Sequence, residues 1–321
     1  MRLFLEFPAS LTPQIAPWLP IRWYGLLSII AIVVTIALFR HEARRSRLTD
    51  DRDEVTVFFT WVVSGLLIGG RLFYVLVIGT ASEYLTEPWR IVWPFDDGSF
   101  TGLQGMSYHG GVLGAAVATA LFCKTRNNRF FAWADALALS APLGYALARI
   151  GNFVNGELVG RVTAAPWAVL FPGARRVPIE ESWAQHIAEQ AGIAVRPEEA
   201  LVNLPRHPSQ LYGALLAGLV VWLVLWFGFR KRRMFPGALT GLYLAGYGVA
   251  RLIVGYFQGI ESTRFALTFG ARAESHHMVG VLTSLSGGQI VSVGMTAVGV
   301  CILVFARLYR PELPYVSTYT E

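Results

Sequence analysis

Seven stretches of mostly apolar residues, separated by polar segments, dominate the chain. They cover residues 22–39, 55–78, 109–123, 132–150, 209–229, 237–258 and 288–308. A transmembrane helix needs about 20 such residues, so each stretch predicts one membrane span. The third is short for a bilayer, and we expect it to extend into residues 106–108 or to be partly re-entrant. The pattern predicts an all-α polytopic membrane protein with seven transmembrane helices.

Composition supports this class. Only 15% of the 321 residues are charged, against about 25% in soluble domains, and the mean hydropathy is +0.47. No internal repeat, low-complexity tract or separate soluble domain is evident, so we expect residues 1–321 to form a single transmembrane domain. The N-terminus has no basic region followed by a continuous apolar core, and we therefore expect no cleavable signal peptide.

Basic residues gather in alternate connecting segments. Residues 40–54, 124–129 and 230–236, together with Arg307 and Arg310, hold 14 of the 27 Lys and Arg. All of them fall on one side of the membrane if the helices alternate. Because cytoplasmic segments are enriched in Lys and Arg, we expect the N-terminus outside and the C-terminus in the cytoplasm.

Three longer segments then lie outside, at residues 79–108, 161–208 and 259–287. The insert at 161–208 contains PIEESWAQHIAEQAG, which predicts a short amphipathic helix opened by Pro178 and two glutamates. We expect this insert to form a small extracytoplasmic head over the membrane surface.

Three arginines, Arg71, Arg149 and Arg251, lie within or at the ends of predicted spans. An arginine near the bilayer centre costs about 2.5–3.5 kcal/mol on insertion scales, so each needs a partner or a function. Arg149 could simply extend to the interface, and Arg71 could pair internally or bind helix ends. Three such side chains together favour an anion as their partner, because the planar guanidinium suits phosphate oxygens.

Two further stretches carry candidate chemistry. In GMSYHGGVLGA (105–115), His109 opens the third span beside two glycines. A histidine there can act as an acid, a base or a donor to an anion, although an isolated one is usually a satisfied interfacial residue. In LPRHPSQLYG (204–213), Pro208 marks a helix start, whose free N–H groups suit a phosphate.

The stretch RIGNFVNGELVGR, residues 149–161, is too polar for a lipid-facing helix and too rich in glycine to continue one. We expect it to line a polar cavity at the outer face, where broken helices are allowed. The lining residues are Arg149, Asn152, Asn155, Glu157 and Arg161. Neither Cys123 nor Cys301 has a metal-ligand spacing, and we expect inert thiols, with neither a metal nor an organic cofactor.

This combination resembles the bacterial prolipoprotein diacylglyceryl transferase family. The matching stretches are IRWYGLL (21–27), IGGRLFYVL (68–76), GMSYHGGVLG (105–114), ARIGNFVNGELVGR (148–161), LFPGAR (170–175), RHPSQLY (206–212), GYGVARLIV (246–254) and GGQIVSVGM (287–295). They run from the first span to the last in the family's order. The resemblance implies seven helices with the N-terminus outside, in agreement with the charge distribution.

The resemblance also implies a reaction. The diacylglyceryl group of phosphatidylglycerol moves to the lipobox cysteine of a prolipoprotein signal peptide, and glycerol phosphate leaves. Arg149 and Arg251 would bind the phosphate, and His109 matches a histidine proposed as the base for the thiol, a role that another group could fill. The implied substrate-binding residues are Tyr24, Arg71, Asn152, Asn155, Glu157 and Gly160. The implied setting is the bacterial cytoplasmic (inner) membrane, with a monomeric enzyme and no nucleic-acid partner.

The chain departs from the family's pattern at three positions. Gly255 and Gly213 stand where glutamates are usual, and Gln258 stands where an arginine is usual. Because residues i and i+4 share a helix face, Arg251 lacks its expected carboxylate partner at 255. One alternative is therefore a catalytically weakened paralogue that binds lipid or lipoprotein precursors. A second is an organic-anion transporter, which the absence of inverted repeats disfavours.

Overall fold

The computed structural model describes most of the chain between residues 4 and 308. The residues outside the description are 1–3, 9–10, 17, 79–83, 85, 94, 97–98, 101–104, 196–199, 233, 259–265, 269–283 and 309–321. Two of the basic residues noted above, Arg233 and Arg310, lie outside the described residues, as does most of the expected outer segment 259–287.

In the described ranges, a long helical segment lies at each of the seven predicted spans. The segments are α1 (Trp23–Arg45), α2 (Arg52–Phe73) with the π-helical turn η1 (Tyr74–Ile78), α4 (Tyr108–Thr125), α5 (Phe130–Val154), a continuous run of α7 (Ser209–Tyr212), η3 (Gly213–Val220), α8 (Val221–Leu223) and η4 (Val224–Phe229), then α9 (Ala238–Phe257) and α11 (Gly287–Leu308). Segments η3 and η4 are also π-helical, so their hydrogen bonds reach one residue further than in an α-helix.

Six of these segments are long and apolar enough to cross a membrane, counted over the described residues. The remaining one, α4, has 18 residues with polar side chains at both ends. The expected all-α polytopic architecture is confirmed, and the chain is a multi-pass membrane protein. The count of seven spans stays a prediction, because it depends on α4.

Polar side chains fix several helix ends. Asp51 accepts a hydrogen bond from the backbone N–H of Asp53 (2.9 Å) where α2 begins. Ahead of α9, Gly237 adopts a left-handed φ of 91°, and its N–H donates to the buried Asp135 carboxylate (2.8 Å). Asp135 also accepts from the backbone N–H of Thr240 (2.8 Å). A carboxylate from α5 thus satisfies the first N–H groups of α9, which otherwise have no helical acceptor.

Glycines let neighbouring helices approach closely. A Cβ added at Gly69 of α2 would lie 2.7 Å from the Cα of Gly114 on α4. On α9, a Cβ added at Gly241 would lie 2.9 Å from the carbonyl oxygen of Gly299 on α11. Small residues play this part in membrane bundles, where association depends on close packing instead of on water exclusion.

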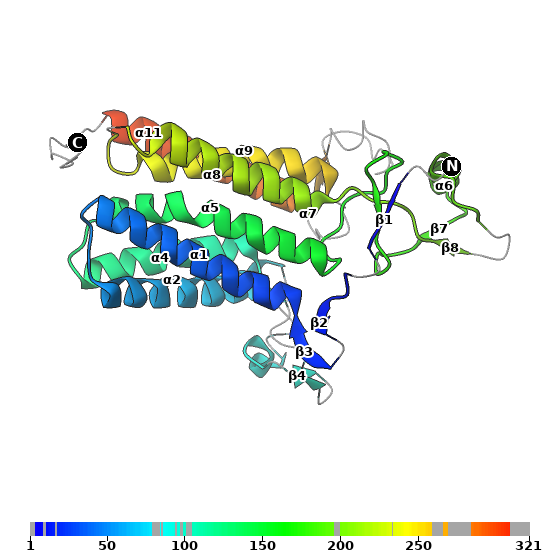
Figure 1. The fold of residues 1–321 in the computed structure, drawn as a ribbon, viewed down its shortest axis with the longest axis horizontal. Coiled ribbons are helices and arrows are strands. Elements are labelled where there is room, and N and C mark those ends of the chain that lie inside the picture. Colours follow the sequence, from blue (N-terminus) through cyan, green and yellow to red (C-terminus); the bar gives the residue numbers. More distant parts are fainter. Residues whose placement is uncertain are drawn as a thin grey trace.

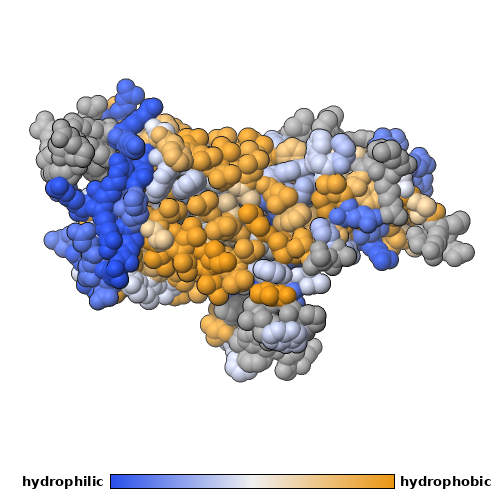
Figure 2. Space-filling view, viewed as in Figure 1, coloured by the Kyte–Doolittle hydropathy of each residue, from blue (hydrophilic) through white to orange (hydrophobic). Residues whose placement is uncertain are grey.

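The helices form two layers (Figure 1). One layer holds α1, α2, α4 and α5, and the other holds α7, α8, α9 and α11, with α5 in contact with both η3 and α9. Figure 2 shows an apolar band around the middle of the molecule and a hydrophilic cap where α1 ends and α2 begins. That cap contains the basic segments predicted to be cytoplasmic.

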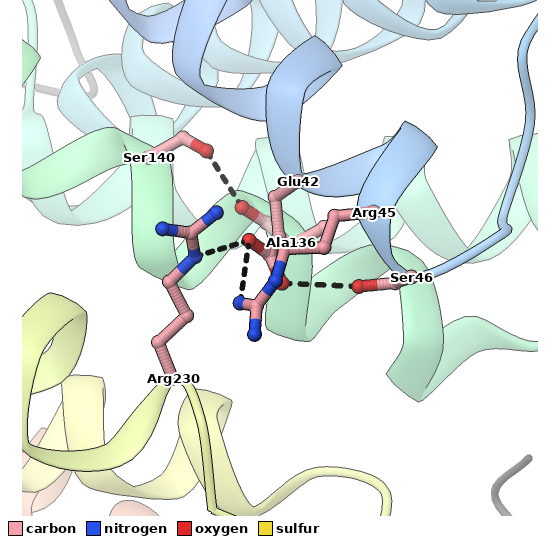
Figure 3. Close-up of polar contacts among 6 residues, drawn as sticks. All are labelled: Glu42, Arg45, Ser46, Ala136, Ser140 and Arg230. Carbon is pink, nitrogen blue, oxygen red and sulfur yellow. Dashed lines mark hydrogen bonds and ion pairs between the residues drawn. The ribbon is translucent and has the colours of Figure 1, made fainter. Parts of the chain in front are cut away.

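An ion pair joins the two layers at this cap (Figure 3). The Glu42 carboxylate, near the end of α1 and only 3% exposed, accepts a hydrogen bond from Arg230 Nε (2.6 Å) just after η4. Arg45 (3.7 Å) and the Ser46 hydroxyl (3.0 Å) contact the same carboxylate. Because a buried carboxylate needs compensating donors, these contacts tie the layers together.

A small head, formed largely by residues of the insert 161–208, lies at the opposite end of the bundle (Figure 1). Helix α6 (Ser182–Ala191) ends at Gly192 in a left-handed conformation (φ 69°), the usual residue for that position. Its Ala184 and Ala188 pack on Val177, Val202 and Leu204. The described strands, which were not anticipated, form two-stranded ladders: β7 (Val177–Pro178) with β8 (Leu201–Val202), β1 (Leu5–Glu6) with β6 (Val169–Leu170), β2 (Gln14–Ala16) with β3 (Leu19–Arg22), β4 (Phe95–Asp96) with β5 (Ser99–Phe100), and β9 (Ala266–Thr268) with β10 (Ser284–Ser286). A further 3₁₀ turn, η2, covers Pro88–Ile91.

Candidate functional site

Polar side chains from three elements meet at the end of the bundle that carries the head. Arg149 and Asn152 lie in the last two turns of α5, Gln210 in α7, and Arg251 near the end of α9. His109, the second residue of α4, lies within range of the positive charges of Arg251 and Arg149. His109 thus lies within electrostatic range of both arginines, and the catalytic role that the resemblance implies for the three residues stays a prediction.

Two neighbours on α5 hold Arg149. Its Nε donates a hydrogen bond to the Tyr145 hydroxyl (2.9 Å), and its Nη1 donates to the Asn152 side-chain oxygen (3.4 Å). The guanidinium carbon also lies 5.0 Å from the centre of the Tyr145 ring, in cation–π range. Tyr145 was missed in the sequence, although its position one turn before Arg149 could have indicated it.

The segment after α5 is fixed to the start of α7. Asn152 Nδ2 donates to the Glu157 carboxylate (2.8 Å), and Gln210 Nε2 donates to the Glu157 carbonyl (2.6 Å). The Ser209 hydroxyl donates to the carbonyl of Leu158 (3.1 Å), whose φ of 56° is unusual for a branched residue. These bonds keep Asn152 turned so that its oxygen can accept from Arg149.

Only one of the Arg251 guanidinium nitrogens has a side-chain hydrogen-bond partner among the described residues. Its Nη2 donates to the Gln258 side-chain oxygen (3.1 Å). Its Nε and Nη1 are buried and have no hydrogen-bond partner among the described residues. Because leaving a buried charged donor unpaired costs free energy, such donors indicate a place for an anion.

His109 also has a ring nitrogen that is available to a ligand. Its Nε2 is buried and has no hydrogen-bond partner within the described ranges. The start of α4 is capped by Ser107, whose hydroxyl accepts from the N–H of Gly110 (3.4 Å). The ring of Tyr108 stacks on Tyr247 of α9, with 5.5 Å between the ring centres, and this contact joins α4 to the helix that carries Arg251.

Gly160 joins the segment after α5 to the end of α9 and to the segment just before α7. It forms a β-bridge with Gln258, and its N–H donates to the His207 carbonyl (3.0 Å). An added Cβ would overlap the His207 carbonyl and lie 2.5 Å from that of Phe257. Only glycine allows this approach.

The other predicted residues differ in their placement. Tyr24, near the start of α1, packs on Gly151, next to Asn152. Asn155 caps the end of α5 and has a buried side-chain oxygen without a hydrogen-bond partner among the described residues. Arg161, predicted to line the cavity, donates through Nε to the Gln258 carbonyl (2.9 Å).

Arg71 engages a different part of the molecule. Its guanidinium donates to the backbone carbonyls of Arg90 (2.5 Å), Ile91 (2.7 Å) and Gly105 (3.1 Å). It also lies 5.4 Å from the centre of the Tyr84 ring. These contacts hold the connection between α2 and α4, which leads directly to His109.

Gly213 and Gly255, where the resemblance implies glutamates, have different surroundings. A Cβ at Gly213 would lie 3.5 Å from the Tyr145 hydroxyl and 3.7 Å from Arg149 Cγ, which is ordinary contact distance. A Cβ at Gly255 would lie 2.6 Å from Gln289 Cγ on α11. Gln289 is buried and donates through Nε2 to the carbonyl of Leu252 (3.4 Å). The space beside Arg251 is thus filled from α11, whereas the space beside Arg149 is open.

Within the described part of the chain, no three His, Cys, Asp or Glu side chains gather closely enough to hold a metal ion. The arrangement offers anion-binding donors, from Arg149 and Arg251, next to a histidine that can take up a proton.

Known proteins resemble the chain over nearly its whole length. The family model described as "Prolipoprotein diacylglyceryl transferase" matches residues 12–305. A relative from Treponema pallidum (strain Nichols), named phosphatidylglycerol–prolipoprotein diacylglyceryl transferase, is 39% identical over 92% of this chain and 93% of its own length. Relatives with the same name come from Treponema denticola, 37% identical over 98% and 97%, and from Chlorobaculum tepidum, 34% identical over 94% and 92%.

Proposed function

Because the chain belongs to the prolipoprotein diacylglyceryl transferase family, we propose that it transfers the diacylglyceryl group of phosphatidylglycerol to the lipobox cysteine of a prolipoprotein. The products are a thioether-linked lipoprotein precursor and glycerol phosphate. The observation that carries the proposal is the gathering of two arginines, Arg149 and Arg251, with His109 at one end of the bundle. The names of the relatives supply the two substrate classes.

The leaving phosphate would be received by the arginines. As the bond between the diacylglyceryl carbon and the phosphate oxygen breaks, the electron pair passes to the phosphate group. The unpartnered Nε and Nη1 of Arg251 can donate to its oxygens, while Arg149 adds a second positive charge. Donors fixed in place before the reaction stabilise this charge most strongly in the transition state.

The sulfur nucleophile belongs to the substrate. In the proposed reaction, His109 in its neutral form accepts the thiol proton as the carbon–sulfur bond forms. Its buried Nε2 has no competing hydrogen-bond partner among the described residues. Asn152 and Glu157 act as positioning residues for Arg149, and Gly160 permits the chain crossing that supports them. Tyr24 and Asn155 would border the substrate.

For Arg71 we propose a positioning role. Its donors are engaged by the backbone that leads into α4, so its influence on substrate would pass through the placement of His109. Lipid cross-linking at position 71 tests the direct contact with substrate that the resemblance implies for Arg71.

We propose a bacterial inner-membrane location with the N-terminus outside. The basic segments gather in one hydrophilic cap (Figure 2), and the positive-inside rule assigns that cap to the cytoplasm. The candidate site then opens towards the outer leaflet, where exported precursors arrive. Reporter fusions at the two termini test this orientation, since a periplasmic reporter should be active only at the N-terminus. We expect a monomer, which light scattering of the purified protein in detergent would test.

Complementation tests the proposed activity. The gene should restore growth and lipoprotein modification to a strain depleted of its own transferase. Purified protein given phosphatidylglycerol and a lipobox peptide should release glycerol phosphate. Normal expression in the membrane with substrate binding but no transfer would contradict the proposal and favour the weakened paralogue.

A further inference from the structure

A second group of cations lies at the opposite end of the bundle from the candidate site. An open cavity of about 650 Å³ lies between the end of α1 and the start of α2. It is lined by Ala37, Arg40, His41, Arg44, Arg45 and Arg52. Tyr24 and Arg40 are 16 residues apart on α1, so the cavity is about 24 Å from the candidate site at a rise of 1.5 Å per residue.

The described residues leave two donors of this basic cavity without a hydrogen-bond partner. Arg40 Nε and Nη2 are buried without a hydrogen-bond partner among the described residues, and the charges of Arg44 and Arg52 act on Arg40. The buried acid nearby, Glu42, contacts Arg230 and Arg45. Like charges held together around unpaired donors create a site for an anion.

The surface next to the cavity is apolar. Ile29 (60% exposed) and Val33 (58% exposed) precede Ala37 on α1 at intervals of four residues, so all three share one helix face with Arg40 and Arg44. Figure 2 shows the hydrophilic cap directly bordering the apolar band. A ligand that fits this face has a phosphate at the arginines and a hydrocarbon chain along α1.

We propose that this cavity binds the phosphate of an anionic phospholipid from the leaflet at the basic end of the helices. This second lipid site is separate from the site of diacylglyceryl transfer, and the proposal is independent of that activity. The bound lipid supplies the acceptor that the Arg40 donors lack, and it holds the junction of α1 and α2 against the membrane surface. Clusters of Lys and Arg at the cytoplasmic membrane surface recognise anionic lipids in this way.

The test is a titration of the full-length protein in detergent with phosphatidic acid, followed by native mass spectrometry. The double variant Arg40→Gln/Arg44→Gln should lose about 30-fold in affinity at one lipid site, the effect of removing two interfacial charges. The matched control Lys124→Gln/Arg126→Gln removes two exposed charges from the same end but none from the cavity. The control should bind as the parent does.

Two further measurements distinguish lipid binding in this cavity from misfolding of the double variant and from binding of any phosphate. Ala37→Trp fills the cavity without changing its charge and should also weaken lipid binding, which decides the matter if the double variant does not fold. Inorganic phosphate at the same concentration should not displace the lipid. Equal weakening in the control, unchanged binding in Ala37→Trp, or equally tight binding of inorganic phosphate would each overturn the proposal.

Discussion

Arg149 and Arg251 meet the cost of a buried guanidinium in different ways. Arg149 has the Tyr145 hydroxyl, the Asn152 oxygen and an aromatic face. Among the described residues, Arg251 has one neutral partner, the Gln258 side-chain oxygen, and two donors without a hydrogen-bond partner. Arg149 is therefore held in position before any ligand arrives, whereas Arg251 has spare capacity for one.

Replacing Arg149 by lysine tests whether the site needs only a positive charge at this position or also the planar shape of the guanidinium. Lysine keeps the positive charge but cannot donate to Tyr145 and Asn152 while also presenting a planar face to phosphate. We expect kcat/KM to fall by roughly 10²–10³-fold, comparable to the loss of one transition-state donor, with an unchanged melting temperature. Arg126→Lys, at an exposed position, should have normal activity. Near-normal activity of Arg149→Lys would make Arg149 an interfacial anchor.

His109→Gln tests the proton acceptor. Glutamine retains hydrogen bonding but cannot take up a proton, so transfer to the lipobox peptide should slow by about 10²–10⁴-fold. Phosphatidylglycerol binding, measured separately, should change little. A loss below about threefold would leave His109 a positional role only, without affecting the role of the arginines.

At the scale of whole elements, helix packing gives positions 255 and 213, where the resemblance implies glutamates, different surroundings. Gln289 of α11 fills the space beside Gly255, and Gly248 and Gly241 continue the same close contact between α9 and α11. By contrast, Gly213 faces Arg149 across ordinary contact distances. A side chain at position 255 would therefore meet a neighbouring helix, whereas the first side-chain carbon at position 213 fits without a clash.

The two glutamate substitutions should accordingly differ. Gly255→Glu forces Gln289 aside, and overpacking of this kind costs about 1–3 kcal/mol. Its melting temperature in detergent should fall. Gly213→Glu places a carboxylate next to Arg149 and should fold as stably as the parent. Equal melting temperatures of the two variants would contradict this prediction, because they would show that Gln289 and α11 can move aside without loss of stability.

The elements themselves were largely predictable, and the site was predictable in part. Apolar runs of the right length located every long helix, because the bilayer leaves few alternatives for such segments. Two-residue ladders such as β1 with β6 were not predictable, since so short a strand shows no hydrophobic alternation. The sequence motifs around Arg149 and His109, together with the cost of placing an arginine in a membrane, identified these two residues as candidates for the site. The supporting role of Tyr145 and the closed space at Gly255 depend on contacts between helices that no local pattern records.

At the scale of the whole molecule, the head and the helices meet around His207. Its Nδ1 lies 3.1 Å from the Tyr212 hydroxyl, and its ring packs edge-on against Phe257 of α9. Burial, and then the nearby charge of Arg161, lower the pKa of His207 from its ordinary value. The folded state thus favours the neutral ring.

This lowered pKa predicts an acid-sensitive junction. Above about pH 6.5, His207 is neutral in both folded and unfolded chains. Below that pH, the unfolded chain binds a proton more readily, so stability falls as the pH drops towards the lower folded pKa. The melting temperature of His207→Gln should therefore decrease less between pH 7 and pH 5 than that of the parent. A decrease in His207→Gln as large as that in the parent would contradict the assignment.

The ion pair between Glu42 and Arg230 also has a consequence for the order of biosynthesis. Its two residues are 188 positions apart, so Glu42 enters the membrane boundary long before Arg230 has been translated. During that interval its nearby partners are Arg45 and Ser46, which the same stretch of chain supplies at once. These local contacts shield the carboxylate while the helical segments between Glu42 and Arg230 are being inserted, and Arg230 then completes the pairing. The link between the two layers at the hydrophilic cap is therefore one of the later contacts to form during synthesis.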